Sequence, residues 1–243
     1  MNLCIDRGNT RTKIAVFHQN DLIFEHAAKT VSIYQLKRWA SQYAVKNVMF
    51  SSVKDYPVTW ESFFRGFNNS IILSPETNLP FVNAYSTPHT LGMDRIALIC
   101  AAGSLFPKKP VLVIGAGTCI TLNFINEEGV FLGGSIHPGL QMRFWAMHTY
   151  TKKLPLIPFQ QENPLIGNST QTSMLSGVVN GAVHEIDGMI DEYKVKNPKL
   201  AVIISGGDAQ IFESKLKNKI FAIPNCVLLG LNQILNYNVQ YQS

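Results

Sequence analysis

The sequence predicts an α/β fold with two mixed sheets, one in each half of the chain, and a cleft between the halves. Short apolar runs typical of strands alternate with segments whose apolar residues recur at helical spacing. The segment LCIDRGNTRTKIAVF has a counterpart, LVIGAGTCITLNFI, with the same succession of strand, glycine-containing turn, threonine and strand. The spacing of about 109 residues is too long for a solenoid and indicates two related halves. We therefore predict domains over residues 1–108 and 109–243, with ligands in the crevice between them.

The composition is that of a globular chain without a nucleic-acid or membrane surface. Of 243 residues, 46% are apolar and 15% are charged, which excludes disorder. The net charge is +5, but the basic residues are scattered, whereas nucleic-acid-binding proteins concentrate them. A weak preference for anionic small molecules fits better. The sequence shows no long apolar run and no signal peptide, so we predict a cytoplasmic protein without a membrane partner.

The cysteine pattern agrees with a reducing compartment. The four cysteines are far apart and lie in apolar surroundings, as expected of small buried side chains: Cys4, Cys100, Cys119 and Cys226.

Individual elements follow from the local pattern. In the first half we predict three strands within the first 27 residues, a helix capped by Ser32 and a strand at 47–53. Residues 74–90 read as an irregular connection, and 92–106 as a helix that is apolar nearly all round and therefore buried. The second half is predicted to contain strands at 111–114, 121–125, 130–132 and 200–205, a helix through Val178 to Ile190 and a last helix from about Asn225.

The first candidate site is the turn between the first two strands. Gly8 permits close backbone approach, and successive amides in such a turn form an anion site. Threonine hydroxyls and the Lys13 ammonium add donors, while Asp6 at the strand end could hold Mg²⁺ through water. Taken alone, a plain hairpin turn explains the same residue types. The segment consists of Asp6, Arg7, Gly8, Asn9, Thr10, Arg11, Thr12 and Lys13.

The duplicate of that turn, Gly115-Ala116-Gly117-Thr118-Cys119, is the second candidate. One turn from each half could hold a polyphosphate from both sides. The sequence contains no P-loop motif, and the third glycine of a dinucleotide fingerprint is missing. A third glycine-containing segment, Gly206-Gly207-Asp208, opens a helix and could contact a nucleotide, or Asp208 could simply cap that helix.

The fourth candidate, Gly92-Met93-Asp94-Arg95, opens the apolar helix. Two charged side chains at a buried helix start need a reason, because unpaired buried charges are costly. A mutual ion pair with a favourable Asp at the helix N-terminus is one explanation. A general base beside a guanidinium that grips a carboxylate is the other.

Together these motifs resemble those of the type III pantothenate kinases, over nearly the whole chain and in the same order. GMDR matches the family's G-x-D-R, while DRGNTRTK and GAGTCITLN resemble its two phosphate motifs. Three further fragments, IHPGLQMRFWAMHTYTKKLP, IGNSTQTSMLSGVVNG and SGGD, are similar to its Pro-Gly helix segment, its Gly-Asn-x-Thr helix and its nucleotide-side turn. Each fragment alone is weak evidence for the resemblance, but six fragments in the same order are strong evidence.

The resemblance implies two ribonuclease-H-like domains of the actin-like, Hsp70-like and sugar-kinase-like ATPase superfamily. It implies ATP-dependent phosphorylation of pantothenate, the first step of coenzyme A synthesis, by a cytoplasmic homodimer that uses Mg²⁺ and a monovalent cation, K⁺ or NH₄⁺. Asp94 would accept the proton of the pantothenate hydroxyl. The segment from Asp6 to Lys13 and Thr118 would bind ATP, and the pantothenate site would comprise Tyr85, Gly92, Met93, Asp94, Arg95 and Thr170.

Two positions depart from the family pattern. The second phosphate motif usually begins with an Asp that binds the monovalent cation, and Gly115 occupies that place here; the motif's closing Asp is Asn123. A hard cation favours carboxylate oxygen, so we expect any potassium dependence to be weak. Two other readings stay open: a weakened or inactive relative that binds nucleotide or pantothenate as a regulatory protein, and a kinase for another small acceptor.

Overall fold

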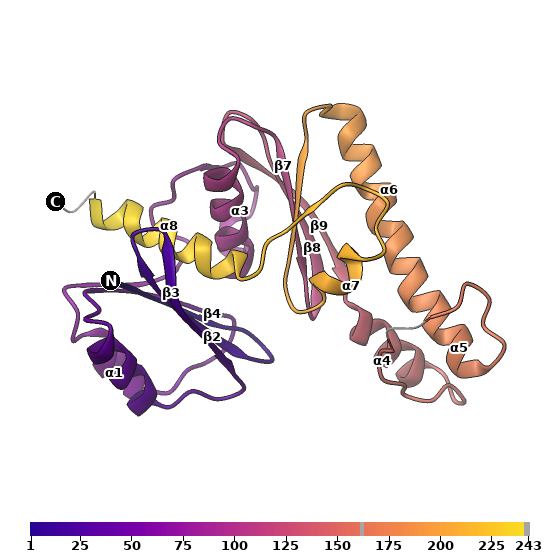
Figure 1. The fold of residues 1–243 in the computed structure, drawn as a ribbon, viewed down its shortest axis with the longest axis horizontal. Coiled ribbons are helices and arrows are strands. Elements are labelled where there is room, and N and C mark those ends of the chain that lie inside the picture. The colour runs from indigo at the N-terminus through magenta and orange to yellow at the C-terminus, as the bar shows by residue number, and fades with distance from the viewer. Residues whose placement is uncertain (161–162, 241–243) are drawn as a thin grey trace. The chain divides into compact units, whose positions relative to one another are not determined.

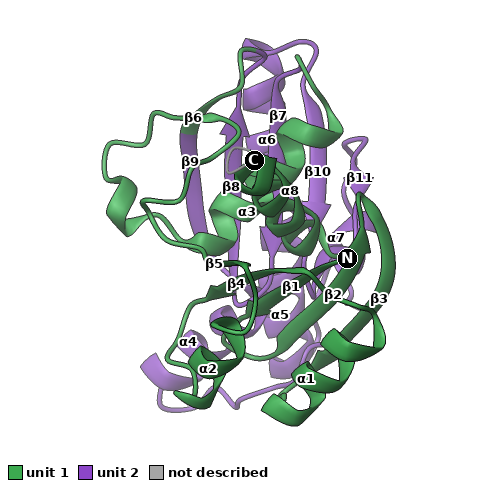
Figure 2. Cartoon of the chain, turned by 90° about the vertical axis from the view of Figure 1, so that its left-hand side faces the viewer, with its two compact units in different colours: residues 1–108, 128–132, 225–243 green, residues 109–127, 133–224 purple. Residues whose placement is uncertain are grey.

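The computed structural model describes residues 1–160 and 163–240, which form two compact units (Figure 2). Unit 1 contains residues 1–108, 128–132 and the C-terminal helix, and unit 2 contains residues 109–127 and 133–224. Each unit contains a sheet with helices, as the α/β prediction requires (Figure 1). The C-terminal helix follows unit 2 in the chain but belongs to unit 1, so unit 1 is assembled from separate stretches of sequence.

Unit 1 is built on a five-stranded sheet with the order β3-β2-β1-β4-β5. The first three strands form antiparallel pairs, and β4 and β5 continue the sheet in parallel with β1. In this register Asp6 lies opposite Lys13 on β2 and Ser51 on β4. The strands are β1 (Asn2–Arg7), β2 (Thr12–His18), β3 (Asp21–Ala28), β4 (Asn47–Ser52) and β5 (Asn69–Ile72).

Alternation along β1 directs its side chains to two different layers. Leu3 and Ile5 belong to a core cluster with Leu36 and Trp39 of α1 (Ile33–Gln42) and with aromatic residues of α2 (Thr59–Phe64). As predicted, the Ser32 side chain caps α1 by accepting from the Gln35 backbone N–H. Asn2, Cys4 and Asp6 face the opposite side, where the remaining helices of the unit pack.

Two helices cover that second face: α3 (Met93–Leu105) and α8 (Cys226–Gln240), which lie side by side (Figure 1). A Cβ atom on Gly230 of α8 would lie 1.8 Å from the Ala97 carbonyl oxygen of α3, so the two backbones touch at this crossing. The middle of α3 is buried all round, as its sequence predicts. Glycine at 230 is therefore what allows α3 its close approach to α8.

A ladder of asparagine side chains joins α8 to the sheet. Asn69 Nδ2 donates to Asn47, and Asn47 Nδ2 donates to Asn2, each at 2.8 Å. Asn2 Nδ2 then donates to Asn232 at 2.8 Å and to Asn236 at 2.7 Å on α8. These buried and half-buried amides satisfy one another, which ties the C-terminal helix to β1 by directional contacts.

Unit 2 contains a second sheet, with β10 parallel to β7 and β8 antiparallel to β7. Its strand order is β11-β10-β7-β8-β9, and the first residues of β9 count with unit 1, where they pair with β6 (Val82–Asn83). The strands are β7 (Val111–Ala116), β8 (Cys119–Ile125), β9 (Val130–Pro138), β10 (Ala201–Ser205) and β11 (Phe221–Ala222). Gly115 and Ala116, expected in a turn, are the last residues of β7, which leaves only Gly117 and Thr118 outside the strands.

The helices of unit 2 pack on a core formed by β7, β8 and β10. They are α4 (Leu140–Tyr150), α5 (Thr170–Leu175), a π-helical turn (Ser176–Asn180), α6 (Gly181–Lys196) and α7 (Ala209–Glu213). Between residues 74 and 90, where we predicted an irregular connection, β6 and a 3₁₀ turn (Pro88–Thr90) are the only regular elements. In the described residues no helix has the length and apolar character needed to span a membrane.

The α3–α8 crossing gives a stability prediction. Gly230→Ala should lower the free energy of unfolding by about 1–3 kcal/mol, because the new methyl group collides with the Ala97 backbone and forces the helices apart. Gly188→Ala is the matched control: Gly188 is a helical glycine of α6 with no atom near its Cβ position, so alanine should stabilise the chain by up to about 1 kcal/mol. Urea unfolding of both variants measures the difference, and equal midpoints would contradict the backbone contact.

Candidate functional site

Three charged side chains gather at the carboxyl end of β1. Asp6 is only 9% exposed and faces Lys13 across the β1–β2 pair. Burial raises the pKa of Asp6 to about 6, the Lys13 ammonium opposes this shift, and the Asp94 carboxylate adds to it. The Asp94 carboxylate at the start of α3 therefore lies within electrostatic range of Asp6.

The turn that follows Asp6 is exposed at its tip and anchored at both ends. Its Gly8 N–H donates to the Arg11 carbonyl at 3.1 Å, while Asn9, Thr10 and Arg11 are open to solvent. The Lys54 ammonium donates to the Asn9 carbonyl at 3.1 Å and fixes the tip from outside.

The side chains at the base of this turn are more enclosed. Thr12 is buried, and the Arg7 guanidinium carbon lies 5.5 Å from the centroid of the Trp60 ring. Neither the buried Arg7 Nε nor the buried Ser51 Oγ has a hydrogen-bond partner among the described residues. Polar atoms in this condition have bonding capacity left for a ligand.

Gly92 is the N-cap of α3, and Asp94 lies in the first turn of that helix. A Cβ atom on Gly92 would be 2.5 Å from Asp94 Oδ1, so a side chain at position 92 would displace the carboxylate from its present place. Asp94 is half-buried, and the helix N-terminus favours its negative charge. The glycine of the GMDR motif thus serves to leave room for the Asp94 side chain.

Arg95 is 4% exposed and lies against two aromatic rings. Its guanidinium carbon is 5.4 Å from the Tyr85 centroid and 5.9 Å from that of Phe131. The two rings stack on each other, with centroids 5.8 Å apart. Tyr85 is a predicted site residue, but Phe131 is not. Phe131 lies on a short strand 36 positions after Arg95, and no sequence pattern indicates that the two side chains are in contact.

In unit 2 the Gly117–Thr118 turn is enclosed by two other glycines. The Gly139 N–H donates to the Thr118 carbonyl at 3.1 Å, and a Cβ atom on Gly139 would lie 2.2 Å from the Gly117 carbonyl oxygen. Gly206, which has a positive φ of 114°, approaches the Ala116 carbonyl in the same way. Thr118 itself is exposed. Glycine is required at these contacts because any side chain would push the turn away.

The Gly206-Gly207-Asp208 segment also contacts this turn. The Asp208 N–H donates to the Ala116 carbonyl at 3.1 Å, and α7 begins directly afterwards. Asp208 occupies the N-cap position, but its side chain makes no capping hydrogen bond, and burial raises its pKa. The prediction that the Asp208 side chain caps the helix is therefore wrong, although the residue occupies the N-cap position.

The two positions that depart from the family pattern carry no carboxylate. Gly115 lies on β7 opposite Thr121. Asn123 is fully buried, and its Nδ2 donates to the Val113 carbonyl and to Thr121 Oγ1, both at 3.2 Å. Over the described ranges, no group of three or more His, Cys, Asp or Glu side chains has the arrangement of a metal site.

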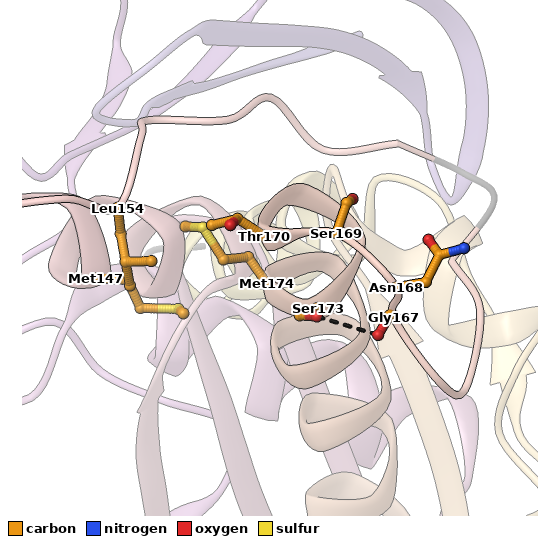
Figure 3. A pocket seen from close by; sticks show the side chains of 8 residues that line it. All are labelled: Met147, Leu154, Gly167, Asn168, Ser169, Thr170, Ser173 and Met174. Atoms are coloured by element: carbon orange, nitrogen blue, oxygen red, sulfur yellow. Dashed lines mark hydrogen bonds between the residues drawn. The ribbon is translucent and has the colours of Figure 1, made fainter.

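Thr170 borders a cavity of about 650 Å³ in unit 2, between the end of α4 and the start of α5 (Figure 3). Ser169 caps α5 together with Thr172, which presents the first helical residue, Thr170, at the rim. The lining residues are Met147, Leu154, Gly167, Asn168, Ser169, Thr170, Ser173 and Met174.

The predicted site residues thus divide between the two units. Unit 1 contains the Asp6 to Lys13 turn, Tyr85 and the GMDR motif, with Met93 half-buried at the start of α3. Unit 2 contains Thr118 and Thr170. Sequence reasoning missed Trp60, Phe131 and Gly139, each of which contacts a predicted residue.

Solved structures of sugar kinases share this fold. A glucokinase from an Antarctic psychrotroph has a similar solved structure, with a TM-score of 0.54, 11% sequence identity and coverage of 97% of this chain and 98% of that one. Such neighbours agree with two ribonuclease-H-like domains, which confirms the predicted fold class.

The family follows from the sequence comparisons. A family-wide sequence profile described as "Type III pantothenate kinase" matches residues 2–192. Type III pantothenate kinases from Christiangramia forsetii and Phocaeicola vulgatus are 43% and 42% identical to this chain, each over 98% of its length and 99% of theirs. The chain belongs to the type III pantothenate kinase family and is a kinase, which confirms the resemblance seen in the motifs.

The raised pKa of Asp6 predicts a stability that depends on pH. Between its ordinary value of 3.8 and about 6, the folded chain holds a proton on Asp6 that the unfolded chain has lost, so stability falls as pH rises through this window. Asp6→Asn removes this penalty and should stabilise the ligand-free protein at pH 8 by about 1–3 kcal/mol.

The gain should disappear below the ordinary pKa of 3.8, where both states are protonated. Urea unfolding at several pH values measures it, with Asp21→Asn, a change at an exposed aspartate of β3, as the control. A pH-independent difference would show that burial of the charge is not its cause.

Proposed function

We propose that this chain phosphorylates pantothenate with ATP, the first step of coenzyme A synthesis, and that Asp94 is the general base. The assignment of Asp94 rests on its position in the first turn of α3, within electrostatic range of Asp6. Gly92, the N-cap of the same helix, has no side chain that would displace the Asp94 carboxylate. Family membership supports the substrates.

Asp94 would take the proton from the pantothenate hydroxyl as that oxygen attacks the γ-phosphorus of ATP. The bond between the γ-phosphorus and the β–γ bridging oxygen would break, and ADP would leave with that oxygen. A base within hydrogen-bond reach of the alcohol contributes about 10²–10⁴-fold to the rate. Most of the remaining effect in phosphoryl transfer comes from positioning and charge balance.

Arg95 and Tyr85 would bind the acceptor, together with Gly92, Met93 and, from unit 2, Thr170. The Tyr85 and Phe131 rings hold the Arg95 guanidinium in one orientation. A fixed planar guanidinium suits a carboxylate, which it can grip through two parallel hydrogen bonds. Pantothenate has a carboxylate at the end opposite its reacting hydroxyl. In this proposal Asp94 would contact the hydroxyl, and Arg95 would bind the carboxylate.

ATP would be bound by the turn from Asp6 to Lys13 and, from unit 2, by Thr118. The exposed amides and hydroxyls of the first turn and the Lys13 ammonium offer donors to phosphate oxygens. The buried carboxylate of Asp6 beside Asp94 fits a role in holding Mg²⁺ through water, since a divalent cation would relieve the repulsion between the two charges. When bound, Mg²⁺ neutralises charge on the phosphates.

The residues present do not fit a monovalent-cation site of the family type. Gly115 supplies only backbone atoms, and the Asn123 amide is already engaged with the strand and with Thr121. We therefore propose an enzyme whose activity depends little on K⁺ or NH₄⁺.

We further propose a cytoplasmic homodimer. Unit 2 exposes large apolar side chains on α4 and the segment after it, including Trp145, Tyr150, Leu165 and Ile166, at 57–87% exposure. Exposed apolar side chains in this number support a contact with a second copy of the chain, which would cover them.

Asp94→Asn should lower kcat by a factor of about 10²–10⁴ while ATP binding survives, because the amide keeps the shape but cannot accept the proton. A coupled ADP-release assay with and without pantothenate gives the rate, and calorimetry with a non-hydrolysable ATP analogue gives the binding. An active Asp94→Asn variant would place the base elsewhere. Wild-type protein that binds ATP but releases no pantothenate-dependent ADP would favour the inactive-relative interpretation.

Arg95→Ala provides the contrasting change in the same helix. Loss of the guanidinium should mainly raise KM for pantothenate, by about tenfold or more, since a carboxylate grip acts on binding. The same ADP assay measures it, with the ATP dependence as the internal control. An unchanged KM for pantothenate would reject the assigned role of Arg95.

The absent carboxylate at position 115 gives a cation prediction. Replacing a bulky organic cation by K⁺ at constant ionic strength should change kcat/KM by less than about twofold. Gly115→Asp restores the family residue and should make the rate respond to K⁺. Strong activation of the unmodified enzyme by K⁺ would contradict the proposal.

A further inference from the structure

A polar cluster in unit 2 lies outside every site residue named above. It comprises Ser135 and His137 on β9, Arg143 on α4 and Glu185 on α6. Ser135 Oγ and His137 Nε2 are 2.6 Å apart, and the other ring nitrogen, Nδ1, is hydrogen-bonded to Glu185 Oε1. Arg143 Nη2 donates to Glu185 Oε2 at 2.7 Å. Both oxygens of one carboxylate are therefore engaged by separate elements.

This cluster is more enclosed than an ordinary surface ion pair. The side chains of His137, Arg143 and Glu185 are 17%, 20% and 33% exposed. By contrast, the Arg65–Glu61 pair of unit 1 is 83% and 46% exposed, with a longer separation of 3.7 Å. Charge-assisted hydrogen bonds in a partly desolvated network hold their members in one geometry.

The cluster also holds the backbone that leads into α4. Arg143 Nε donates to the Pro138 carbonyl at 2.9 Å, and the Arg143 N–H donates to the Gly139 carbonyl at 3.1 Å. His137 directly precedes Pro138. The path of residues 137–139 is thereby fixed from two sides, by the side chain of Glu185 and by the guanidinium of Arg143.

That same backbone forms one wall of the Gly117–Thr118 turn. The Gly139 N–H donates to the Thr118 carbonyl at 3.1 Å, and no room exists for a Cβ atom on Gly139, because the Gly117 and Thr118 carbonyl oxygens would lie 2.2 Å and 2.5 Å from it. The position of Gly139 therefore constrains the conformation of the turn.

We propose that His137, Arg143 and Glu185 are positioning residues that set the conformation of the Gly117–Thr118 turn for ATP. The chain of contacts runs from Glu185 through Arg143 to Pro138 and Gly139, and from Gly139 to Thr118. This inference rests on the proposed function, since it assumes that Thr118 contacts ATP. Substitutions in this cluster should weaken nucleotide binding and leave pantothenate binding unaltered.

Arg143→Ala breaks the side-chain bonds to both Glu185 and Pro138, and Glu185→Gln removes the charge while it keeps the shape. Each should raise KM for ATP by about tenfold, the factor that the loss of a charge-assisted hydrogen bond produces. KM for pantothenate should stay within about twofold. Arg143→Lys keeps the charge but cannot form both bonds at once, so it should fall between the wild type and Arg143→Ala.

Arg65→Ala is the matched control, because it removes an exposed Arg–Glu pair of the same kind in unit 1. It should leave both KM values unchanged. A purely structural role of the cluster would lower the melting temperature and affect both substrates alike. If Arg143→Ala fails to fold, the milder Glu185→Gln and Arg143→Lys variants decide the question through the same ratio of KM values.

A double-mutant cycle shows whether the effect passes through the turn. If Arg143 acts through Thr118, Arg143→Ala combined with Thr118→Ala should bind a non-hydrolysable ATP analogue no more weakly than Thr118→Ala alone. Additive losses, or unchanged ATP affinity in Arg143→Ala, would overturn the inference. A Thr118→Ala variant with wild-type ATP affinity would instead refute the ATP contact in the proposed function, and the inference with it.

Discussion

The contact between the backbones of α3 and α8 is the constraint on which the geometry of unit 1 depends. Gly230 brings α8 against the Ala97 carbonyl, and the asparagine ladder ties α8 to the central strand β1. The helix α3 is thereby held over the face of the sheet to which Asp6 points, with Asp94 at its open end. Two carboxylates placed together at a buried site repel each other, and the fold bears this cost through helix packing elsewhere.

Close backbone approach is also how this chain shapes its second turn. Gly139 and Gly206 come from segments far apart in sequence, and each meets the backbone of residues 116–118 where a side chain would not fit. The structure therefore specifies the turn by neighbours as well as by its own glycines. Glycine permits the close approach but does not restrict the backbone conformation. The hydrogen bonds of His137, Arg143 and Glu185 supply this restriction for the segment that contains Gly139.

The sequence was sufficient for the parts that depend on local pattern. Strand alternation, the Ser32 cap and the apolar α3 follow from short-range rules. The duplication indicated two related halves, and six motifs in register resembled those of the kinase family. The placement of α8 could not be predicted, because an amphipathic helix does not indicate which of two sheets it covers. Phe131 and Gly139 were missed for a similar reason: their importance lies in contacts across elements, which no spacing in the chain encodes.

The interrupted course of unit 1 has a consequence for how the protein is made. A ribosome releases the whole of unit 2 before it releases α8, which supplies the partners of Asn2 and the surface against which Ala97 packs. Until α8 emerges, the nascent N-terminal sheet lacks the helix against which α3 packs. The position of Asp94 relative to Asp6 is then not fixed. Assembly of the N-terminal end of α3 therefore depends on a helix that the ribosome adds after unit 2, and chains shortened before α8 would lack this support.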